Sequence, residues 1–221
     1  MTIYSNTNIS IEKFKNSYKL MIKNTSLFFQ YHSYLSNKLP NIINDTKTKD
    51  KKEIIFNCEN IDILNNKNKE NLTYNDLENF FINFKEMLEF LEKDKHSLLF
   101  IDINDFILIK LEDNVHLLLF INSDKFLKLE NDNIEILSPF SKKNMFLSPE
   151  LYKIENIPHK INKKSIYYSI AVFISHCINT INDVENISFY NNNESINNTK
   201  LYFGLIRCLE NNINNRFYLF I

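Results

Sequence analysis

The most apolar stretch of the chain is the feature that most constrains its fold. From Asn162 to Asn179 the sequence reads NKKSIYYSIAVFISHCIN, a helix candidate with almost no polar face. A helix that is apolar on nearly all sides is buried on several of them, so it belongs at the centre of a domain. The segment before it is interrupted by Pro149 and Pro158 and predicts a loop that leads into this helix.

A second helix is predicted from about Asn75 to Lys93. Thr73 and Asp76 form a capping-box pattern, in which a hydroxyl precedes a carboxylate by three residues. The apolar side chains that follow have the spacing of one buried helix face: Leu77, Phe80, Phe81, Phe84, Met87, Leu88 and Leu91. A last amphipathic helix is predicted from about Lys200 to Glu210, and another candidate, Tyr31 to Leu39, ends at a proline.

Short apolar runs predict strands in the rest of the chain. They are Ser26 to Gln30, Glu53 to Asn57, Leu98 to Ile103, Phe106 to Leu111, Val115 to Ile121, Phe126 to Leu129 and Ile134 to Leu137. The sequence Leu111 to Val115 predicts a hairpin turn, because Asp and Asn tolerate the backbone of tight turns. Residues 1–72 are less regular than residues 73–221, so two regions are expected, and a long helix followed by hairpins indicates an α+β arrangement.

Composition excludes several functional classes. The formal net charge of -1 gives no electrostatic attraction to nucleic acid or to an anionic membrane, so neither is expected as a partner. No apolar run reaches the roughly 18 residues that span a bilayer. The three widely spaced cysteines are predicted to be reduced, which indicates an intracellular, cytoplasmic protein. The five histidines lack zinc-site spacing, so no metal or other cofactor is expected.

The chain contains a single glycine, Gly204, within the last predicted helix. Loops that bind phosphate groups need several glycines, so that the backbone can approach the phosphates with unusual φ angles. A Walker A loop, a Rossmann fingerprint and a kinase Gly-rich loop are therefore excluded as motifs.

Two stretches of the second half resemble protein kinases. Ser148 to Glu150 is similar to the Ala-Pro-Glu motif, and the apolar helix is similar to the central helix of the kinase C-lobe. In that helix Tyr168 matches an aromatic position and Ser169 a serine, whereas Ile166 replaces the family's aspartate. The stretch that ends at Arg216 resembles a late C-lobe segment in which an arginine follows a helix end.

This resemblance implies a fold and one contact. The fold is a protein kinase-like α+β fold, with a mainly helical C-lobe at 73–221 and a reduced, degenerate N-lobe at 1–72. The contact is an ion pair between Glu150 and Arg216. The glycine-poor sequence of AT-rich style also resembles kinase-like proteins of large DNA viruses.

The resemblance leaves the catalytic positions degenerate. Aligned without a gap, Phe106 replaces the asparagine that binds the metal, and Ile101 replaces the catalytic aspartate. Aligned with a gap, Asp102 is kept as the base and Asp105 approximates the metal ligand. Asn122 lies near the Asp-Phe-Gly position, where its neutral amide would be a weaker ligand for Mg²⁺ than a carboxylate.

The resulting hypothesis is a catalytically inactive kinase-like domain, a pseudokinase, that acts as a scaffold and binds a protein partner. The alternative is an atypical, active Ser/Thr protein kinase that uses Asp102 without a Gly-rich loop. A third possibility is an α+β interaction domain with no kinase ancestry, which predicts no contact between Glu150 and Arg216.

Overall fold

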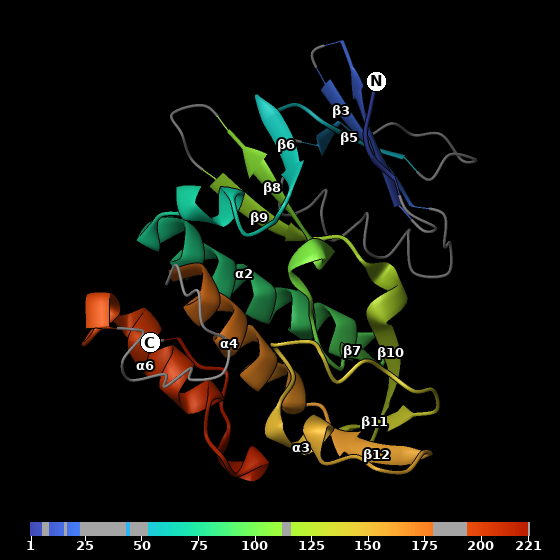
Figure 1. The fold of residues 1–221 in the computed structure, drawn as a ribbon, viewed down its shortest axis with the longest axis vertical. Helices are drawn as coiled ribbons and strands as arrows, with labels where there is room; N and C mark the ends of the chain where they lie inside the picture. The colour runs from blue at the N-terminus through green and yellow to red at the C-terminus, as the bar shows by residue number, and fades with distance from the viewer. Residues whose placement is uncertain are drawn as a thin grey trace. The chain divides into compact units, whose positions relative to one another are not determined.

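The residues that the structure describes form three sheets, and the strands of each pair in the antiparallel direction (Figure 1). The computed structural model describes residues 1–5, 9–15, 17–22, 43–44, 53–111, 116–178 and 194–220. The predicted strand at Ser26 to Gln30 and helix at Tyr31 to Leu39 lie outside these residues, as does most of the predicted turn from Leu111 to Val115.

The chain forms two units with limits that differ from the predicted regions 1–72 and 73–221. Unit 1 contains Met1–Leu64 and Asn104–Asp124, and unit 2 contains Asn65–Ile103 and Lys125–Ile221. The difference arises because the strands at 106–120 pair with β6 (Asn60–Ile63), so the chain returns to unit 1 after the first helix of unit 2.

Unit 1 contains a five-stranded sheet in the order β1-β2-β3-β5-β4. Its strands are β1 (Thr2–Ser5), β2 (Ile9–Phe14), β3 (Ser17–Ile22), β4 (Ile43–Asn44) and β5 (Glu53–Phe56). Burial alternates along β5, where Ile54 and Phe56 face the core, as expected for a sheet with one covered face. The buried Tyr18 donates its hydroxyl hydrogen to Oδ1 of Asn60 at 3.0 Å, which links this sheet to β6.

The second sheet of unit 1 has the order β6-β8-β9. Its central strand, β8 (Phe106–Lys110), is buried along most of its length, and its neighbour β9 (His116–Phe120) completes the hairpin. The rings of Phe106 and Phe120 pack edge to face with centroids 5.4 Å apart. The predictions of strands at 106–111 and 115–121 are confirmed.

Unit 2 is built on α2 (Tyr74–Lys93), which begins as predicted. The Thr73 hydroxyl accepts a hydrogen bond from the Asp76 backbone, and the Asp76 carboxylate accepts one from the Thr73 backbone, so the capping box is complete. All seven apolar side chains of the predicted stripe are buried. A short 3₁₀ turn, η1 (Asn68–Asn71), precedes the helix.

The apolar stretch forms α4 (Ser165–Ile178), which lies between α2 and α6 (Lys200–Cys208) in Figure 1. Phe80 of α2 and Phe173 of α4 pack with ring centroids 5.5 Å apart. The single glycine has a packing role. A Cβ atom on Gly204 would lie 2.9 Å from the Phe81 ring and 3.3 Å from the Leu219 carbonyl oxygen. Gly204 therefore allows α6 to approach both α2 and the C-terminal segment closely.

Unit 2 also contains a four-stranded sheet in the order β12-β11-β10-β7. Its strands are β7 (His96–Leu98), β10 (Phe126–Glu130), β11 (Asn133–Ile136) and β12 (His159–Asn162). The predicted pairing of the runs at 126 and 134 is confirmed as the β10–β11 hairpin. The predicted strand at Leu98 to Ile103 is mostly wrong, since β7 ends at Leu98.

The predicted kinase-like layout with a mainly helical C-lobe is wrong. The described residues form three antiparallel sheets and four α-helices, one of which, α3 (Pro149–Tyr152), is a single turn. The periodicity that identifies α2 and α4 carries no information about the residues between them. Part of this stretch forms the β10–β11 hairpin, in which Asn131 and Asp132 adopt the positive φ angles, 49° and 61°, of a tight turn. The chain is a small mixed α+β fold.

No helix within the described ranges is both long enough and apolar enough to cross a membrane.

Candidate functional site

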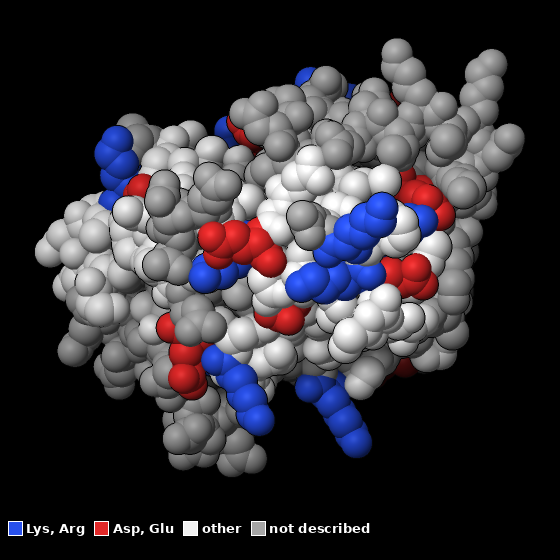
Figure 2. Space-filling model, turned by 90° about the horizontal axis from the view of Figure 1, so that it is seen from above, with Lys and Arg blue, Asp and Glu red and all other residues white. Residues whose placement is uncertain are grey.

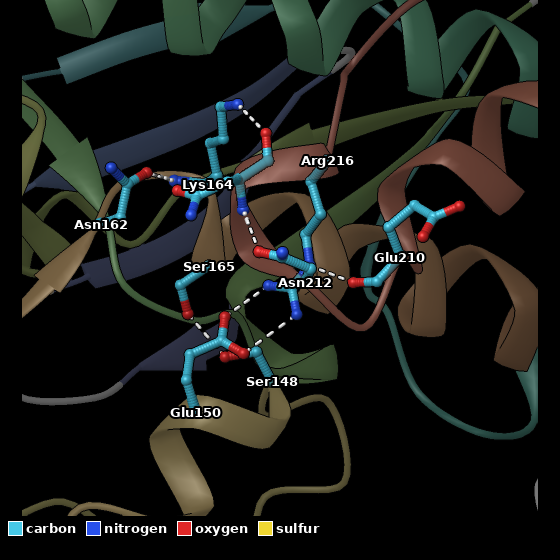
Figure 3. Close-up of polar contacts among 9 residues, drawn as sticks. Ser148, Glu150, Asn162, Lys164, Ser165, Glu210, Asn212 and Arg216 are labelled. Atoms are coloured by element: carbon cyan, nitrogen blue, oxygen red, sulfur yellow. Dashed lines mark hydrogen bonds and ion pairs between the residues drawn. The ribbon is translucent and has the colours of Figure 1, made fainter.

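The two residues that the kinase resemblance pairs, Glu150 and Arg216, form an ion pair (Figure 3). Two guanidinium nitrogens face the carboxylate: Nη1 donates to Oε1, and Nη2 donates to Oε2 at 3.0 Å. The third nitrogen, Nε, donates to the Glu210 carbonyl oxygen at 2.7 Å. The Arg216 side chain is fully buried, and its guanidinium lies 5.0 Å from the centroid of the Tyr168 ring. A planar guanidinium is suited to this combination of a bidentate carboxylate and a ring face.

Each partner is positioned by a short local element. Glu150 lies in the first turn of α3, which begins with Pro149 at a position where a helix needs no backbone N–H. Arg216 follows the 3₁₀ turn η6 (Ile213–Asn215), where the Asn212 side chain accepts a hydrogen bond from the Asn214 backbone at 3.0 Å. These local elements fix the direction from which each charged side chain enters the pair.

A buried pair of serines lies beside the ion pair. The hydroxyl oxygens of Ser148 and Ser165 are 2.6 Å apart, so the residue before α3 is hydrogen-bonded to the first residue of α4. Figure 3 shows the two serines next to Glu150. The same contact region thus joins α3, α4 and the segment after α6.

The electrostatics of Glu150 favour its charged form. Partial burial is the largest single influence and acts to raise the pKa of this carboxyl group. The hydrogen bonds from Arg216, a backbone hydrogen bond, the charge of Arg216 and the Ser148 hydroxyl together outweigh it and hold the pKa below its ordinary value. The pair is therefore ionic at neutral pH. Its arrangement can hold segments together, and it presents no group that could act as an acid or base.

Two of the degenerate catalytic positions, Asp105 and Asn122, lie in unit 1 and contact each other. Asp105 ends the 3₁₀ turn η2 (Ile103–Asp105) and is buried, with an exposed fraction of 4%. Asn122 donates from Nδ2 to the Asp105 carboxylate at 2.8 Å, and the Ile121 backbone N–H donates to the Asp105 carbonyl oxygen at 2.9 Å. The structure therefore brings Asp105 and Asn122 together, with the amide occupying one carboxylate oxygen.

The remaining predicted positions are divided between the two units. Asp102 belongs to unit 2, whereas Asp105 belongs to unit 1. Ile101 and Phe106, the residues that a gap-free alignment puts in the catalytic positions, are both fully buried. Each of these two side chains is part of the packed core of its own unit. Across the described ranges, no three His, Cys, Asp or Glu side chains are grouped closely enough to hold a metal ion.

Sequence reasoning missed a buried lysine in unit 2. Lys69, in η1, is only 3% exposed, although it lies in the polar run from Asn65 to Glu70. Its Nζ donates to the His176 carbonyl oxygen at 2.9 Å and lies 3.1 Å from Nε2 of the same residue. The contact ties η1 to the C-terminal end of α4, where helix carbonyl groups lack partners within the helix. No sequence signal distinguishes Lys69 from the other lysines of the chain.

Burial governs the titration of this pair. Burial, followed by the charge of Lys69, lowers the pKa of His176 to about 4, so the imidazole is neutral at pH 7. Burial also lowers the pKa of Lys69. The adjacent Cys177 is a free thiol whose pKa burial raises to about 12, so it is not a reactive thiolate. His176, Lys69 and Cys177 form a structural cluster.

Comparison of the chain with protein-family models gives no match, and comparison with curated proteins gives none either.

Proposed function

We propose that the chain is a non-catalytic module that binds or scaffolds a protein partner, with motifs related to those of inactive protein kinases. The observation that carries this proposal is the buried Asp105 carboxylate, which accepts a hydrogen bond from the Asn122 amide. Phosphoryl transfer needs metal ligands, a phosphate cradle and a base that act together. The two residues nearest to metal ligands in the alignment bond to each other, and the single glycine lies in a packed helix.

The relation to kinases is part of this proposal and does not depend on the kinase layout. It is supported by the bidentate contact between the residue after Ser148-Pro149 and an arginine sixty-six positions later. The free cysteines Cys58, Cys177 and Cys208 support a reducing, cytoplasmic location.

A protein partner is the class that the surface charge favours. On the face in Figure 2, the described basic and acidic side chains lie beside one another. A surface that binds nucleic acid by neutralising phosphates carries a field of one sign. Charged groups of both signs can be matched by complementary charges on a protein partner.

The proposal is tested by a thermal-shift titration with ATP and Mg²⁺ or Mn²⁺. A ligand at 100 times its dissociation constant adds about 2.7 kcal/mol to the free energy of unfolding, so binding would be seen easily. We expect no shift and no transfer of labelled phosphate to a generic substrate. A shift abolished by Asp102→Ala and kept by Asp62→Ala, an exposed carboxylate of β6, would establish the active-kinase alternative.

A further inference from the structure

The surface formed by residues 137–160 of unit 2 combines exposed apolar side chains with a local excess of lysine. Leu137, Tyr152 and Ile157 are 68%, 43% and 40% exposed. We call this surface the lysine-rich face and define it by Leu137, Lys142, Lys143, Lys153, Ile157 and Lys160, all of which are exposed. Large apolar side chains at the surface are ordinary when scattered, but a group surrounded by polar residues marks an interaction site.

Hydrogen bonds and strand pairing position the segments that carry the lysine-rich face. The register of β11 and β12 places Ile136 opposite His159, so Leu137 lies beside the chain that enters β12 from Ile157. Lys142 donates from Nζ to the Tyr152 carbonyl oxygen at 2.8 Å, and the Tyr152 hydroxyl donates to the Asn144 carbonyl oxygen at 2.8 Å. The loop before α3 therefore lies against the end of this helix.

One hydrophobic cluster underlies both loops and the sheet. It includes Ile136 of β11, Leu151 of α3 and Ile161 of β12, together with Ile154, and Phe140 packs against it. Packing on one cluster limits the conformations of the loops before binding, so less conformational entropy is lost when a partner binds.

The charge of this face differs from that of the whole chain, which is -1. Between residues 137 and 160 there are four lysines and two glutamates, Glu150 and Glu155. Glu150 is already neutralised by Arg216. Glu135, which is also exposed, lies opposite Lys160 in the register of β11 and β12. Lys142, Lys143 and Lys153 therefore exceed Glu155, and a partner that complements this local positive charge carries carboxylates.

A hollow adjoins the face and has room for an apolar side chain. Its lining includes Leu127 and Leu137, together with Lys128, Lys160 and the carboxylate of Glu135. Glu130 also lines it, and its carboxylate pairs with Lys128 at 2.6 Å. Interfaces are commonly anchored by an apolar side chain in such a pocket, with charged pairs around it.

We propose that the lysine-rich face binds an acidic, amphipathic segment of a partner protein. The apolar side chains of that segment cover Leu137 and Ile157, and its carboxylates lie against Lys143 and Lys153. The inference rests on the proposed binding function and names the surface and the chemistry of the partner. The exposed apolar side chains favour a peptide over nucleic acid, since a phosphate backbone would leave them uncovered.

The test is fluorescence anisotropy with a labelled helical peptide of about 15 residues built from Glu, Leu and Ala. We expect it to bind at least about tenfold more tightly than the same peptide with Lys in place of Glu, and less tightly as salt rises. The double variant Lys143→Glu with Lys153→Glu should weaken binding about tenfold or more, as should Leu137→Asp. Lys142 is left unchanged, because it bonds the Tyr152 carbonyl.

Matched controls lie elsewhere in unit 2. Lys67→Glu with Lys200→Glu reverses two exposed charges, and Phe203→Asp removes an apolar side chain that is 49% exposed on α6. These controls should bind the peptide as the unchanged protein does, and all variants should keep its thermal midpoint. The inference is overturned if the unchanged protein does not bind the peptide, or if the controls lose as much binding as the variants.

Two further probes distinguish a peptide from nucleic acid and from membranes. Tighter binding of a single-stranded oligonucleotide or of phosphatidylserine vesicles, unaffected by Leu137→Asp, would overturn the peptide assignment and give the face to nucleic acid or to membranes. A nucleotide-dependent thermal shift abolished by Asp102→Ala would overturn the non-catalytic function and leave the peptide result standing. Failure of the peptide alone would remove this face and leave the non-catalytic function standing.

Discussion

Unit 2 contains two buried cations, Arg216 and Lys69, which join distant segments by different chemistry. Arg216 is held by a carboxylate, with two nitrogens on the two oxygens of Glu150. Lys69 donates to a carbonyl oxygen and lies beside a neutral imidazole, both of His176. The pKa of Glu150 is lowered against the effect of burial by its hydrogen bonds and by the charge of Arg216. The pKa of Lys69 is lowered because burial disfavours its charge.

The Arg216–Glu150 contact depends on charge, whereas the Lys69–His176 contact depends on hydrogen bonding. Removing one partner of a buried ion pair leaves an uncompensated charge, which is strongly destabilising. A buried lysine whose ammonium donates to a carbonyl oxygen can lose its charge and keep that hydrogen bond, so its removal costs less. Substitutions at the two sites should therefore differ in magnitude and in their dependence on pH.

The largest effect is expected for Arg216→Ala. The substitution removes a fully buried side chain and the counter-charge of Glu150, and breaking a pair of this kind costs about 3–5 kcal/mol. Chemical denaturation of the purified variant would measure this loss. The control is Arg207→Ala, which removes the other arginine of the chain, a half-buried residue in the last turn of α6, and should cost about 1 kcal/mol or less. Equal losses for the two variants would show that the ion pair has no special role.

The next largest effect is a loss of stability in acid that comes from His176. The unfolded imidazole binds its proton near pH 6.5, whereas the folded one does so only near pH 4, so protonation between these values favours the unfolded state. The contribution of this group is complete above pH 6.5 and is lost as the pH falls to about 4. The loss amounts to about 3 kcal/mol.

The variant His176→Gln isolates this contribution. Glutamine keeps a polar side chain and does not titrate, so the free energy of unfolding should fall less steeply between pH 6.5 and pH 4 than in the unchanged protein. Denaturation curves at a series of pH values would measure the two slopes. Identical slopes would mean that His176 does not carry the effect and that the carboxylates do.

These two sites also show what the sequence can reveal. The partners Glu150 and Arg216 could be predicted because each lies in a short motif that resembles a known one, and the burial of α2 follows from its periodicity. Lys69 could not be predicted, because its burial depends on how η1 meets the end of α4, and that is a tertiary contact. The kinase layout was wrong for a similar reason. Strand pairing in unit 2 depends on partners far along the chain, such as β12 against β11.

A smaller effect is expected for Lys69→Met. Methionine has a similar volume and removes the cost of burying a charge, but it leaves the His176 carbonyl without this donor, so we expect a loss of about 1–2 kcal/mol. The variant should also raise the pKa of His176, because the Lys69 charge is one of the two causes that lower it. An NMR titration of the imidazole would show the pKa move from about 4 toward 6.5. A loss as large as that of Arg216→Ala, with no change in this pKa, would remove the distinction between the two cations.

The smallest effect is expected at Ser169, whose buried hydroxyl has no hydrogen-bond partner among the described residues. Ser165 and Ser169 of α4 are both fully buried. The Ser165 hydroxyl is hydrogen-bonded to Ser148 at 2.6 Å, whereas the Ser169 hydroxyl finds no hydrogen-bond partner within the described residues. A buried hydroxyl without a partner costs free energy, so Ser169→Ala should stabilise the protein by up to about 1 kcal/mol.

Ser165→Ala, the matched control on the same helix, should instead destabilise it by about 1 kcal/mol, because it removes the hydrogen bond to Ser148. Opposite signs in the two thermal midpoints would show that the hydrogen-bond partner decides the effect, as it does for the two cations. A destabilised Ser169→Ala would mean that this hydroxyl is satisfied in solution.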